Sequence, residues 1–328
     1  MIRLTSSLCP ECFSAVPASI SETVGAIWME KKCPSHGWFR GMVERDPFWF
    51  WICARLNAKT IYDGYLIDVT DRCNIKCKYC YHQNGGKDHD VEEIVRDAEA
   101  HKHLAPFGLI GGEPTVHEKL PEIYSRLSKI GKTTILTNAV KLCDEEYFES
   151  LLKCDVVKGN LLDIALSFHK ESGGKDIQFL EMCRSMKLVI PETFFVLDDL
   201  GQIDEALSIY LKFPDVIGSM RLKGASNIGA ETKVTHKIYV SDILNYLSAR
   251  GRTDIDTSVW GNKVSFACVR WENLLLFPCS WYGIDNVDLR DIDCGPWYKA
   301  KDGKVHNLVT TLLLNEGYDK SGSNPKGH

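Results

Sequence analysis

Six short runs rich in β-branched and aromatic residues recur in the middle of the chain, separated by segments whose apolar residues stand three and four apart. That spacing is typical of amphipathic helices, and the short apolar runs are typical of buried strands. The runs are 64–70, 106–112, 132–138, 162–169, 192–197 and 219–224, and the helical segments are 91–104, 118–130, 145–153, 175–187 and 203–213. The alternation predicts βα units around a parallel sheet.

Both ends of the chain depart from this alternation. Residues 1–57 contain two paired-cysteine turns around a short hairpin, and an aromatic run at 46–56 is expected to pack this part onto the core, with lipid binding as an alternative. After about residue 235 we expect a helix at 241–250 and a hairpin at 262–279 that turns near Trp271–Asn273, then a disordered tail at 320–328. The predicted fold is α/β: a partial (β/α)6 TIM-like barrel over residues 58–235, a small N-terminal metal knuckle over 1–57 and a C-terminal α+β extension over 236–328.

Composition narrows the environment and the partners. The chain has 328 residues, 44% of them apolar, and a net charge of −5, so no basic track favours a nucleic-acid backbone. No leader pattern and no apolar run of about 18 residues appears, which leads us to expect a cytoplasmic protein with no membrane span. Because disulfides are uncommon in a reducing cytosol, the thirteen cysteines indicate metal or redox chemistry. Four isolated ones, Cys53, Cys143, Cys154 and Cys183, are expected to be packing residues.

Three cysteines stand together in the loop after the first predicted strand: Cys73, Cys77 and Cys80. In an α/β barrel, active sites lie at the carboxyl ends of the strands, where this loop begins. A 4Fe-4S cluster held by three thiolates keeps one iron without a protein ligand, and that iron can bind something else. The alternative is a zinc knuckle with His82 as its fourth ligand.

The segment CNIKCKYC has the CxxxCxxC pattern and resembles the radical S-adenosylmethionine (radical SAM) superfamily, as does GGEPT at Gly111–Thr115. The resemblance implies a 4Fe-4S cluster whose open iron is chelated by the amino and carboxylate groups of S-adenosylmethionine. An electron from the cluster then cleaves the sulfonium and yields a 5'-deoxyadenosyl radical, which abstracts hydrogen from the substrate.

The same resemblance implies roles for single residues. Tyr79 packs near the adenine, and Glu113 with the motif backbone receives the methionine amino group. Ser167 contacts the ribose or the carboxylate, which Arg221 or Lys223 holds; ordinary polar barrel residues are the alternative for Ser167 and Arg221. His169 either faces the substrate or caps its strand. The full expected cofactor-binding set is Tyr79, Gly111, Gly112, Glu113, Pro114, Asn138, Ser167 and Arg221.

Two further cysteine groups flank the barrel. Cys9, Cys12, Cys33 and His36 form two chelating pairs that suit a closed tetrahedral zinc, with a rubredoxin-like iron or metal-free thiols as alternatives. A knuckle of this kind before a radical core resembles the subgroup of archaeal tetraether lipid synthase and the hydroxymethyl-dihydropterin methylase, over residues 8–225. At the other end, Cys268, Cys279 and Cys294 resemble a SPASM/twitch-like hairpin with a possible auxiliary Fe-S cluster, or are packing cysteines.

The sequence thus predicts a radical SAM enzyme of transferase or isomerase type. The expected reaction is methylation, carbon–carbon bond formation or rearrangement of a small heterocycle or lipid, with flavodoxin or ferredoxin as electron donor. A nucleotide or a hypermodified DNA base is an alternative substrate, which the charge neither favours nor rules out. A non-catalytic Fe-S or zinc scaffold is the alternative of a different class.

Overall fold

The fold comes from a computed structural model of the 328-residue chain. The residues it describes are 2–56, 64–82, 86–228, 234, 236–251, 253–255, 266–280, 282–289, 296–301 and 303–321.

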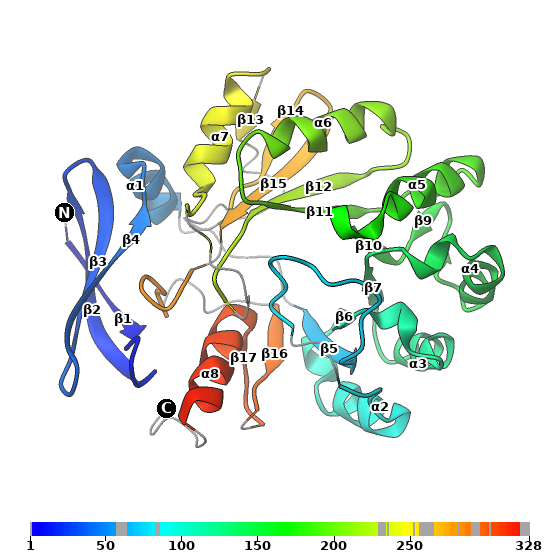
Figure 1. The fold of residues 1–328 in the computed structure, drawn as a ribbon, viewed down its shortest axis with the longest axis horizontal. Coiled ribbons are helices and arrows are strands. Elements are labelled where there is room, and N and C mark those ends of the chain that lie inside the picture. The colour runs from blue at the N-terminus through cyan, green and yellow to red at the C-terminus, as the bar shows by residue number, and fades with distance from the viewer. Residues whose placement is uncertain are drawn as a thin grey trace.

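All six predicted barrel strands are present and lie side by side in one parallel sheet (Figure 1). Their ends differ from the predicted ranges by at most two residues, because each run is bounded by turn residues. The strands are β5 (Tyr65–Thr70), β6 (Phe107–Gly111), β7 (Thr133–Thr137), β10 (Ile164–Ser167), β11 (Glu192–Leu197) and β12 (Ser219–Gly224). Since neighbouring pairs are parallel, all six carboxyl ends share one edge of the sheet.

The predicted helices cover the outer side of this sheet (Figure 1). They are α2 (Val91–Ala100), α3 (Leu120–Leu127), α4 (Glu145–Leu152), α5 (Lys175–Ser185) and α6 (Gln202–Lys212), with the small hairpin β8 (Val157–Lys158) and β9 (Leu161–Leu162) after α4. Asp90 and Asp144 cap α2 and α4 by accepting hydrogen bonds from first-turn amides. The periodic apolar residues of these helices form one core with the outward side of the strands. The partial barrel is therefore as predicted.

The C-terminal region continues the same sheet on both of its edges. β15 (Leu274–Ser280) is parallel to β12 and is followed outward by β14 (Val269–Trp271) and β13 (Thr253–Ile255). On the opposite edge, β16 (Trp297–Lys299) is parallel to β5 and pairs with β17 (Val305–Asn307). Among the described residues the sheet thus has eleven strands, and α7 (Val240–Ser248) and α8 (Leu308–Ser321) complete this region. The predicted hairpin turn is confirmed, and Lys320 and Ser321 of the predicted tail belong to α8.

The N-terminal segment is larger than the short hairpin predicted. It forms a four-stranded antiparallel sheet of β1 (Ile2–Leu8), β2 (Ala15–Thr23), β3 (Ala26–Cys33) and β4 (Gly37–Glu44), which we call the ribbon. Helix α1 (Pro47–Leu56) follows, and its Trp49 and Phe50 are buried in the main core, as the aromatic run predicted. Alternate side chains of β2 and β3 are buried, as in a sheet with one covered face.

The ribbon is fastened to residues 282–289, which follow β15. Arg3 forms an ion pair with Asp288, and the Leu289 amide donates to the Ser6 carbonyl at 3.0 Å. Lys31 is 1% exposed, and its Nζ donates to the Ile284 carbonyl at 2.5 Å. Burial lowers the pKa of Lys31 to about 8. Charged and main-chain contacts consequently hold the ribbon to residues 282–289.

Candidate active site

The loop with the cysteine triplet leaves β5 and lies within the arc of strands, where Figure 1 draws it in cyan. Arg72 anchors the loop through an ion pair with Asp88, 2.7 Å from Nη2 to Oδ2, and Asp88 also accepts from Thr70 Oγ1 at 2.7 Å. The loop is therefore attached at its start to the segment just before α2.

The three thiols suit a cluster better than a single ion. Ligands of one tetrahedral zinc lie about 3.6–3.8 Å apart, given bond lengths near 2.3 Å for sulfur and 2.0–2.1 Å for nitrogen. Cys73, Cys77 and Cys80 do not form a set within 4.8 Å among the described groups, whereas thiolates on different irons of a cube are naturally farther apart. Burial raises the pKa of all three thiols, that of Cys77 to about 12, so a positively charged group is needed to hold them as thiolates.

The two glycines of GGEP fit closely against the start of this loop. A Cβ at Gly111, whose φ is +140°, would lie 2.2 Å from the Thr70 carbonyl oxygen, and one at Gly112 would lie 2.2 Å from that of Arg72. The Gly112 amide donates to Thr70 O at 2.8 Å. The glycines thus let β6 approach the cysteine loop, a role that the sequence did not indicate.

Glu113 is buried, 2% exposed, and its carboxylate accepts four hydrogen bonds from the protein. Oε1 accepts from the amide and hydroxyl of Thr115 and from Thr137 Oγ1, and Oε2 accepts from the Asn138 amide at 2.8 Å. Burial raises the pKa of Glu113, against the opposing effect of these donors. The carboxylate therefore joins the ends of β6 and β7, and its expected contact with the methionine amino group stays a prediction.

Asn138 connects this network to the cysteine loop. Its side-chain Nδ2 donates to Asn74 Oδ1 at 2.8 Å, and Asn74 directly follows the first cysteine. The neighbouring Pro114 is buried at the start of a short 3-10 turn. Asn138 thus contacts the loop, and the expected contacts of Asn138 and Pro114 with the cofactor remain predictions.

Tyr79 lies at a cavity of about 380 Å³ beyond the ends of β10 and β11. Its hydroxyl donates to Asp198 Oδ2 at 3.0 Å, and Lys78 Nζ lies 2.8 Å from the same oxygen. The ion pair and hydrogen bond with Lys78 hold the pKa of the Asp198 carboxyl below its usual range. Phe168 and Phe195, whose rings stack on each other, also line the cavity. Asp198 was missed in the sequence, although it follows a strand as His169 does.

His169 lies against the cysteine loop. Its Nδ1 is 3.3 Å from Cys77 Sγ, and burial lowers the pKa of the imidazole. The Glu171 carboxylate accepts from the Lys78 amide at 3.2 Å. His169 also lines the cavity beside Tyr79, and its expected role at the substrate or as a strand cap stays a prediction.

The remaining strand-end residues lie along the sheet's inner side. Ser167 ends β10 and is partly exposed. Arg221 on β12 pairs with Glu192 at 2.5 Å and stacks over Phe194. Lys223 is half-buried, and burial lowers its pKa to about 7. The structure brings Arg221 and Lys223 together on one strand, but Ser167 and Arg221 as cofactor ligands stay predictions.

His82, the alternative fourth ligand of a zinc knuckle, has another neighbour. Its Nε2 lies 3.4 Å from Asp68 Oδ1 on β5, and Tyr298 of β16 donates to the other carboxylate oxygen of Asp68. His82 therefore connects the end of the cysteine loop to β5.

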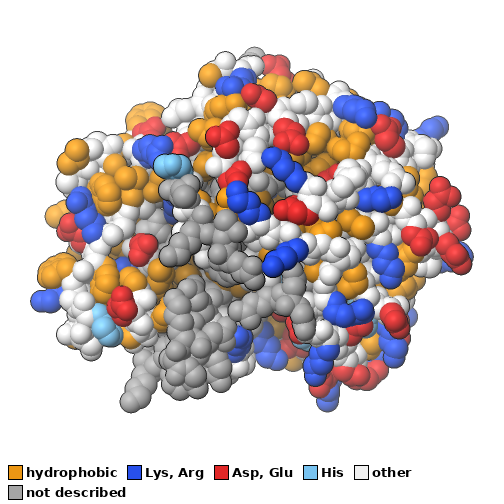
Figure 2. Space-filling view, in the orientation of Figure 1, with side chains coloured by type: hydrophobic (Ala, Val, Ile, Leu, Met, Phe, Trp, Pro, Cys, Tyr) orange, Lys and Arg blue, Asp and Glu red, His pale blue; other side chains and the backbone are white. Residues whose placement is uncertain are grey.

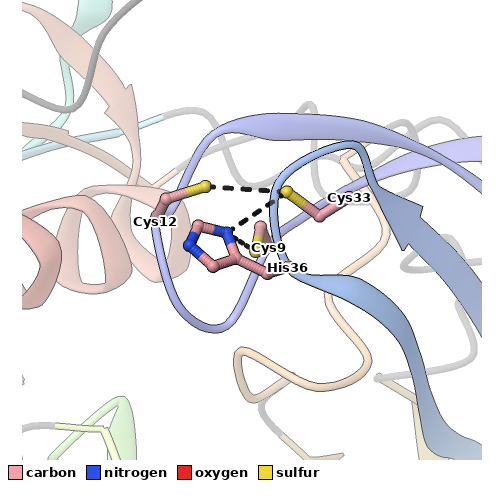
Figure 3. Close-up of side chains that lie close together, drawn as sticks. All are labelled: Cys9, Cys12, Cys33 and His36. Carbon is pink, nitrogen blue, oxygen red and sulfur yellow. Dashed lines mark hydrogen bonds between the residues drawn. The ribbon is translucent and has the colours of Figure 1, made fainter.

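The ribbon holds a compact set of metal ligands (Figure 3). Cys12 Sγ is 3.9 Å from Cys33 Sγ, and His36 Nδ1 is 3.6 Å from Cys9 Sγ and 3.4 Å from Cys33 Sγ. Although burial alone would raise the pKa of Cys33, hydrogen bonds from the Ser35 backbone and the His36 side chain lower it to about 6. These separations and the readily ionised thiol fit one tetrahedral zinc.

The other cysteines divide into two groups. Cys268 and Cys279 are buried on or next to the β14–β15 hairpin, while Cys294 lies outside the described residues, so the auxiliary cluster remains a prediction. Cys53 and Cys183 are buried in the main core, and Cys143 and Cys154 pack against it, which confirms their expected packing role.

Comparison with known families agrees with both metal sites. Residues 67–194 match the radical SAM superfamily, and residues 1–45 match the HMPTM N-terminal zinc ribbon domain. The chain therefore contains a radical SAM domain over residues 67–194, preceded by a zinc ribbon of this type over residues 1–45.

Two curated relatives match part of the chain. It is 31% identical over 189 residues to the 7,8-dihydro-6-hydroxymethylpterin dimethyltransferase of Methanocaldococcus jannaschii, a match that covers 46% of this chain and 37% of the relative. It is 32% identical over 120 residues to a probable GTP 3',8-cyclase of Archaeoglobus fulgidus, covering 34% and 40%. The matched part thus spans about two-fifths of each of these relatives.

Among solved structures, the fold is similar to that of Streptococcus suis SuiB. The crystal structure of SuiB bound to precursor peptide SuiA has a TM-score of 0.53 and 14% identity, covering 81% of this chain and 63% of SuiB. SuiB bound to S-adenosylmethionine gives a TM-score of 0.51 over 78% and 62%. These likenesses support the partial barrel. None of the described helices has the length and apolar character needed to cross a membrane.

Proposed function

We propose that this enzyme reductively cleaves S-adenosylmethionine and uses the product to abstract hydrogen from a small organic substrate at the carboxyl ends of the barrel strands. When bound by Cys73, Cys77 and Cys80, the 4Fe-4S cluster supplies the electron that yields a 5'-deoxyadenosyl radical. The observation that carries the proposal is the position of the loop with the triplet, which lies within the arc of strands and whose first residues, 70–72, pack directly against Gly111 and Gly112.

The chain's own residues have distinct tasks in this proposal. Tyr79 and Phe168 offer aromatic rings to the adenine from the cavity next to the cysteine loop. Glu113 holds the ends of β6 and β7 in register, so that the motif's backbone faces the methionine group. The strands and the loop together exclude water from the reacting carbon.

The substrate we favour is a small nitrogen heterocycle of the pterin type. A relative that is 31% identical over 189 residues is named 7,8-dihydro-6-hydroxymethylpterin dimethyltransferase, and the family that matches the ribbon is the HMPTM N-terminal zinc ribbon domain. Pterin rings present several donors and acceptors, and the inner side of the sheet has Glu192, Arg221 and Lys223 to meet them. Methyl transfer to such a ring is the favoured reaction.

A nucleotide is the second candidate substrate. Arg221 and Lys223 stand two residues apart on β12 and provide two cationic groups for a phosphate. The similarity to a probable GTP 3',8-cyclase supports the same choice. Acidic and basic side chains are interspersed over the face in Figure 2, in keeping with a small ligand rather than a nucleic-acid backbone.

The test is anaerobic turnover. Protein reconstituted with iron and sulfide is incubated with dithionite and S-adenosylmethionine, and 5'-deoxyadenosine is measured with and without hydroxymethyl-dihydropterin or GTP. Deuterium transfer from one labelled candidate into 5'-deoxyadenosine identifies the substrate. Intact S-adenosylmethionine with a fully loaded cluster contradicts the proposal. Replacing dithionite by reduced flavodoxin or ferredoxin tests the proposed electron donor.

A further inference from the structure

A contact between His169 and Cys77 has no task in the proposed reaction. The imidazole Nδ1 lies 3.3 Å from the thiol sulfur. His169 stands two residues past the end of β10, and Cys77 is the middle cysteine of the triplet. The contact therefore joins a barrel strand end to a cluster ligand.

We propose that His169 donates a hydrogen bond from Nδ1 to the Cys77 thiolate and thereby raises the reduction potential of the cluster. This inference rests on the proposed function only in that Cys77 binds cluster iron. His169 affects electron transfer only through its hydrogen bond to the Cys77 thiolate, so we class it as a positioning residue and not as a catalytic one.

The direction of the hydrogen bond follows from the chemistry of the sulfur. An iron-bound thiolate carries no proton and can only accept, so the ring must present Nδ1–H to it. Imidazole always has at least one N–H, and the tautomer with the proton on Nδ1 is the one that this contact selects.

Both partners are held in place by their own loops. The His169 amide donates to Asp176 Oδ2 at 3.3 Å, and the other Asp176 oxygen accepts from the Ile177 amide at 2.8 Å. Asp176 itself is buried, 6% exposed. On the cysteine side, the Lys78 amide next to Cys77 donates to Glu171 at 3.2 Å. The Nδ1–Sγ distance is thus set by two anchored segments.

An N–H dipole aimed at sulfur favours the state with more negative charge. Reduction adds one electron to the cluster, so the hydrogen bond stabilises the reduced form more than the oxidised form. Cys77 and His169 are both half-buried, and a local dielectric below that of water strengthens the interaction. Removing the donor should therefore make the cluster harder to reduce.

A competing reading is a single metal ion. Ligand atoms of Cys77, His169 and Glu171 lie within 4.8 Å of one another. Against this reading, Glu171 already accepts from the Lys78 amide, and Cys77 belongs to the three-cysteine pattern. Metal counting in the experiment separates the two.

The experiment is a redox titration of the reconstituted holoprotein, followed by the electron paramagnetic resonance signal of the reduced cluster. Wild type is compared with His169→Leu, His169→Asn and the exposed control His103→Leu. At the wild-type midpoint we expect the ratio of reduced to oxidised cluster to fall about tenfold in H169L, a shift of ~59 mV for one electron. H169N can place its amide nitrogen where Nδ1 lies, so it keeps a donor to the sulfur and should lie closer to wild type, and H103L should match wild type.

An H169L midpoint equal to wild type, at full iron and sulfide content, overturns the inference. If H169L loses the cluster, H169Q is titrated, since its longer side chain carries the amide past the Nδ1 position and away from the sulfur; an unchanged midpoint then overturns the inference too. Loss of the cluster in every variant at position 169 also overturns the inference. A single metal ion bound at Cys77 in place of the cluster overturns it as well. The midpoint of H169L can differ from that of wild type as expected while wild type forms no 5'-deoxyadenosine. That outcome refutes the proposed function and leaves this inference standing.

Discussion

The carboxylate of Asp198 lies 2.8 Å from the ammonium of Lys78, and this ion pair fastens the loop with the cysteine triplet to the end of β11. The same oxygen accepts from the Tyr79 hydroxyl. One acidic side chain thus positions both residues between Cys77 and Cys80.

Replacing Asp198 by Asn should weaken cofactor binding more than folding. Lys78 is 54% exposed, so losing the pair should lower the free energy of unfolding by less than about 1 kcal/mol. We expect the dissociation constant of S-adenosylmethionine to rise by up to about tenfold, or ~1.4 kcal/mol, because Tyr79 is no longer held. Anaerobic equilibrium binding measures this. Asp199→Asn, at the exposed next residue, is the control, and equal effects of the two variants would contradict the argument.

Cys77→Ala should separate the two metal sites. A cube with only two protein thiolates is poorly held, so we expect cluster iron and 5'-deoxyadenosine formation to fall by about 100-fold or more. Bound zinc should stay at the wild-type level because the ribbon set lies in a different domain. Elemental analysis and chromatography of the nucleoside give the result. Cleavage that persists in C77A would show that the radical chemistry does not depend on this thiol.

Cys33→Ser should remove the response of stability to zinc. When free zinc exceeds the dissociation constant about 1,000-fold, binding adds ~4.1 kcal/mol to the free energy of unfolding. The variant loses one of four ligands and should show little of this gain. Denaturation in zinc-buffered solution measures the difference, and Cys154→Ser, which lies outside the knuckle, should behave like wild type. A zinc response retained in C33S would argue against the four-ligand site.

Glu113→Gln should disturb the junction of β6 and β7. An amide group in place of one carboxylate oxygen faces an N–H or O–H donor, and we expect a loss of about 1–3 kcal/mol in unfolding free energy. Weaker S-adenosylmethionine binding should accompany it. Chemical denaturation and equilibrium binding are compared with Glu118→Gln, an exposed residue of the same loop. If Glu113→Gln is as stable as Glu118→Gln, the four hydrogen bonds of the Glu113 carboxylate do not stabilise the fold.

Glu44 should make stability depend on pH. Burial raises its pKa from 4.5 to about 7, despite hydrogen bonds from Ser241 and two amides. A carboxyl with a raised folded-state pKa stabilises the fold fully below pH 4.5, and this contribution is lost as the pH rises to about 7. Relative to Glu44→Gln, wild type should therefore lose about 1.4 kcal/mol per pH unit in this window. If wild type and Glu44→Gln differ in free energy of unfolding by the same amount at pH 5 and pH 7, as measured by chemical denaturation, the raised pKa of Glu44 is contradicted.

The sequence was sufficient for features that depend on local spacing. Apolar periodicity located the six barrel strands and the helices between them, and cysteine spacing identified the ribbon's ligand set, whose four members lie together. The pairing of β15 with β12 was not predictable, because register between strands far apart in the chain is determined by tertiary packing. The contacts of Glu113 and His169 could not be predicted for a similar reason. Glu113 is hydrogen-bonded to residues at the end of β7, and His169 contacts the loop after β5.

The junction between the ribbon and residues 282–289 bears on how such chains can be dissected. A product that starts at residue 46 would leave Asp288 and the Ile284 carbonyl facing water in place of Arg3 and Lys31. The ribbon and residues 282–289 consequently form one continuous junction, and grafting the ribbon onto another barrel would require transferring residues 282–289 with it.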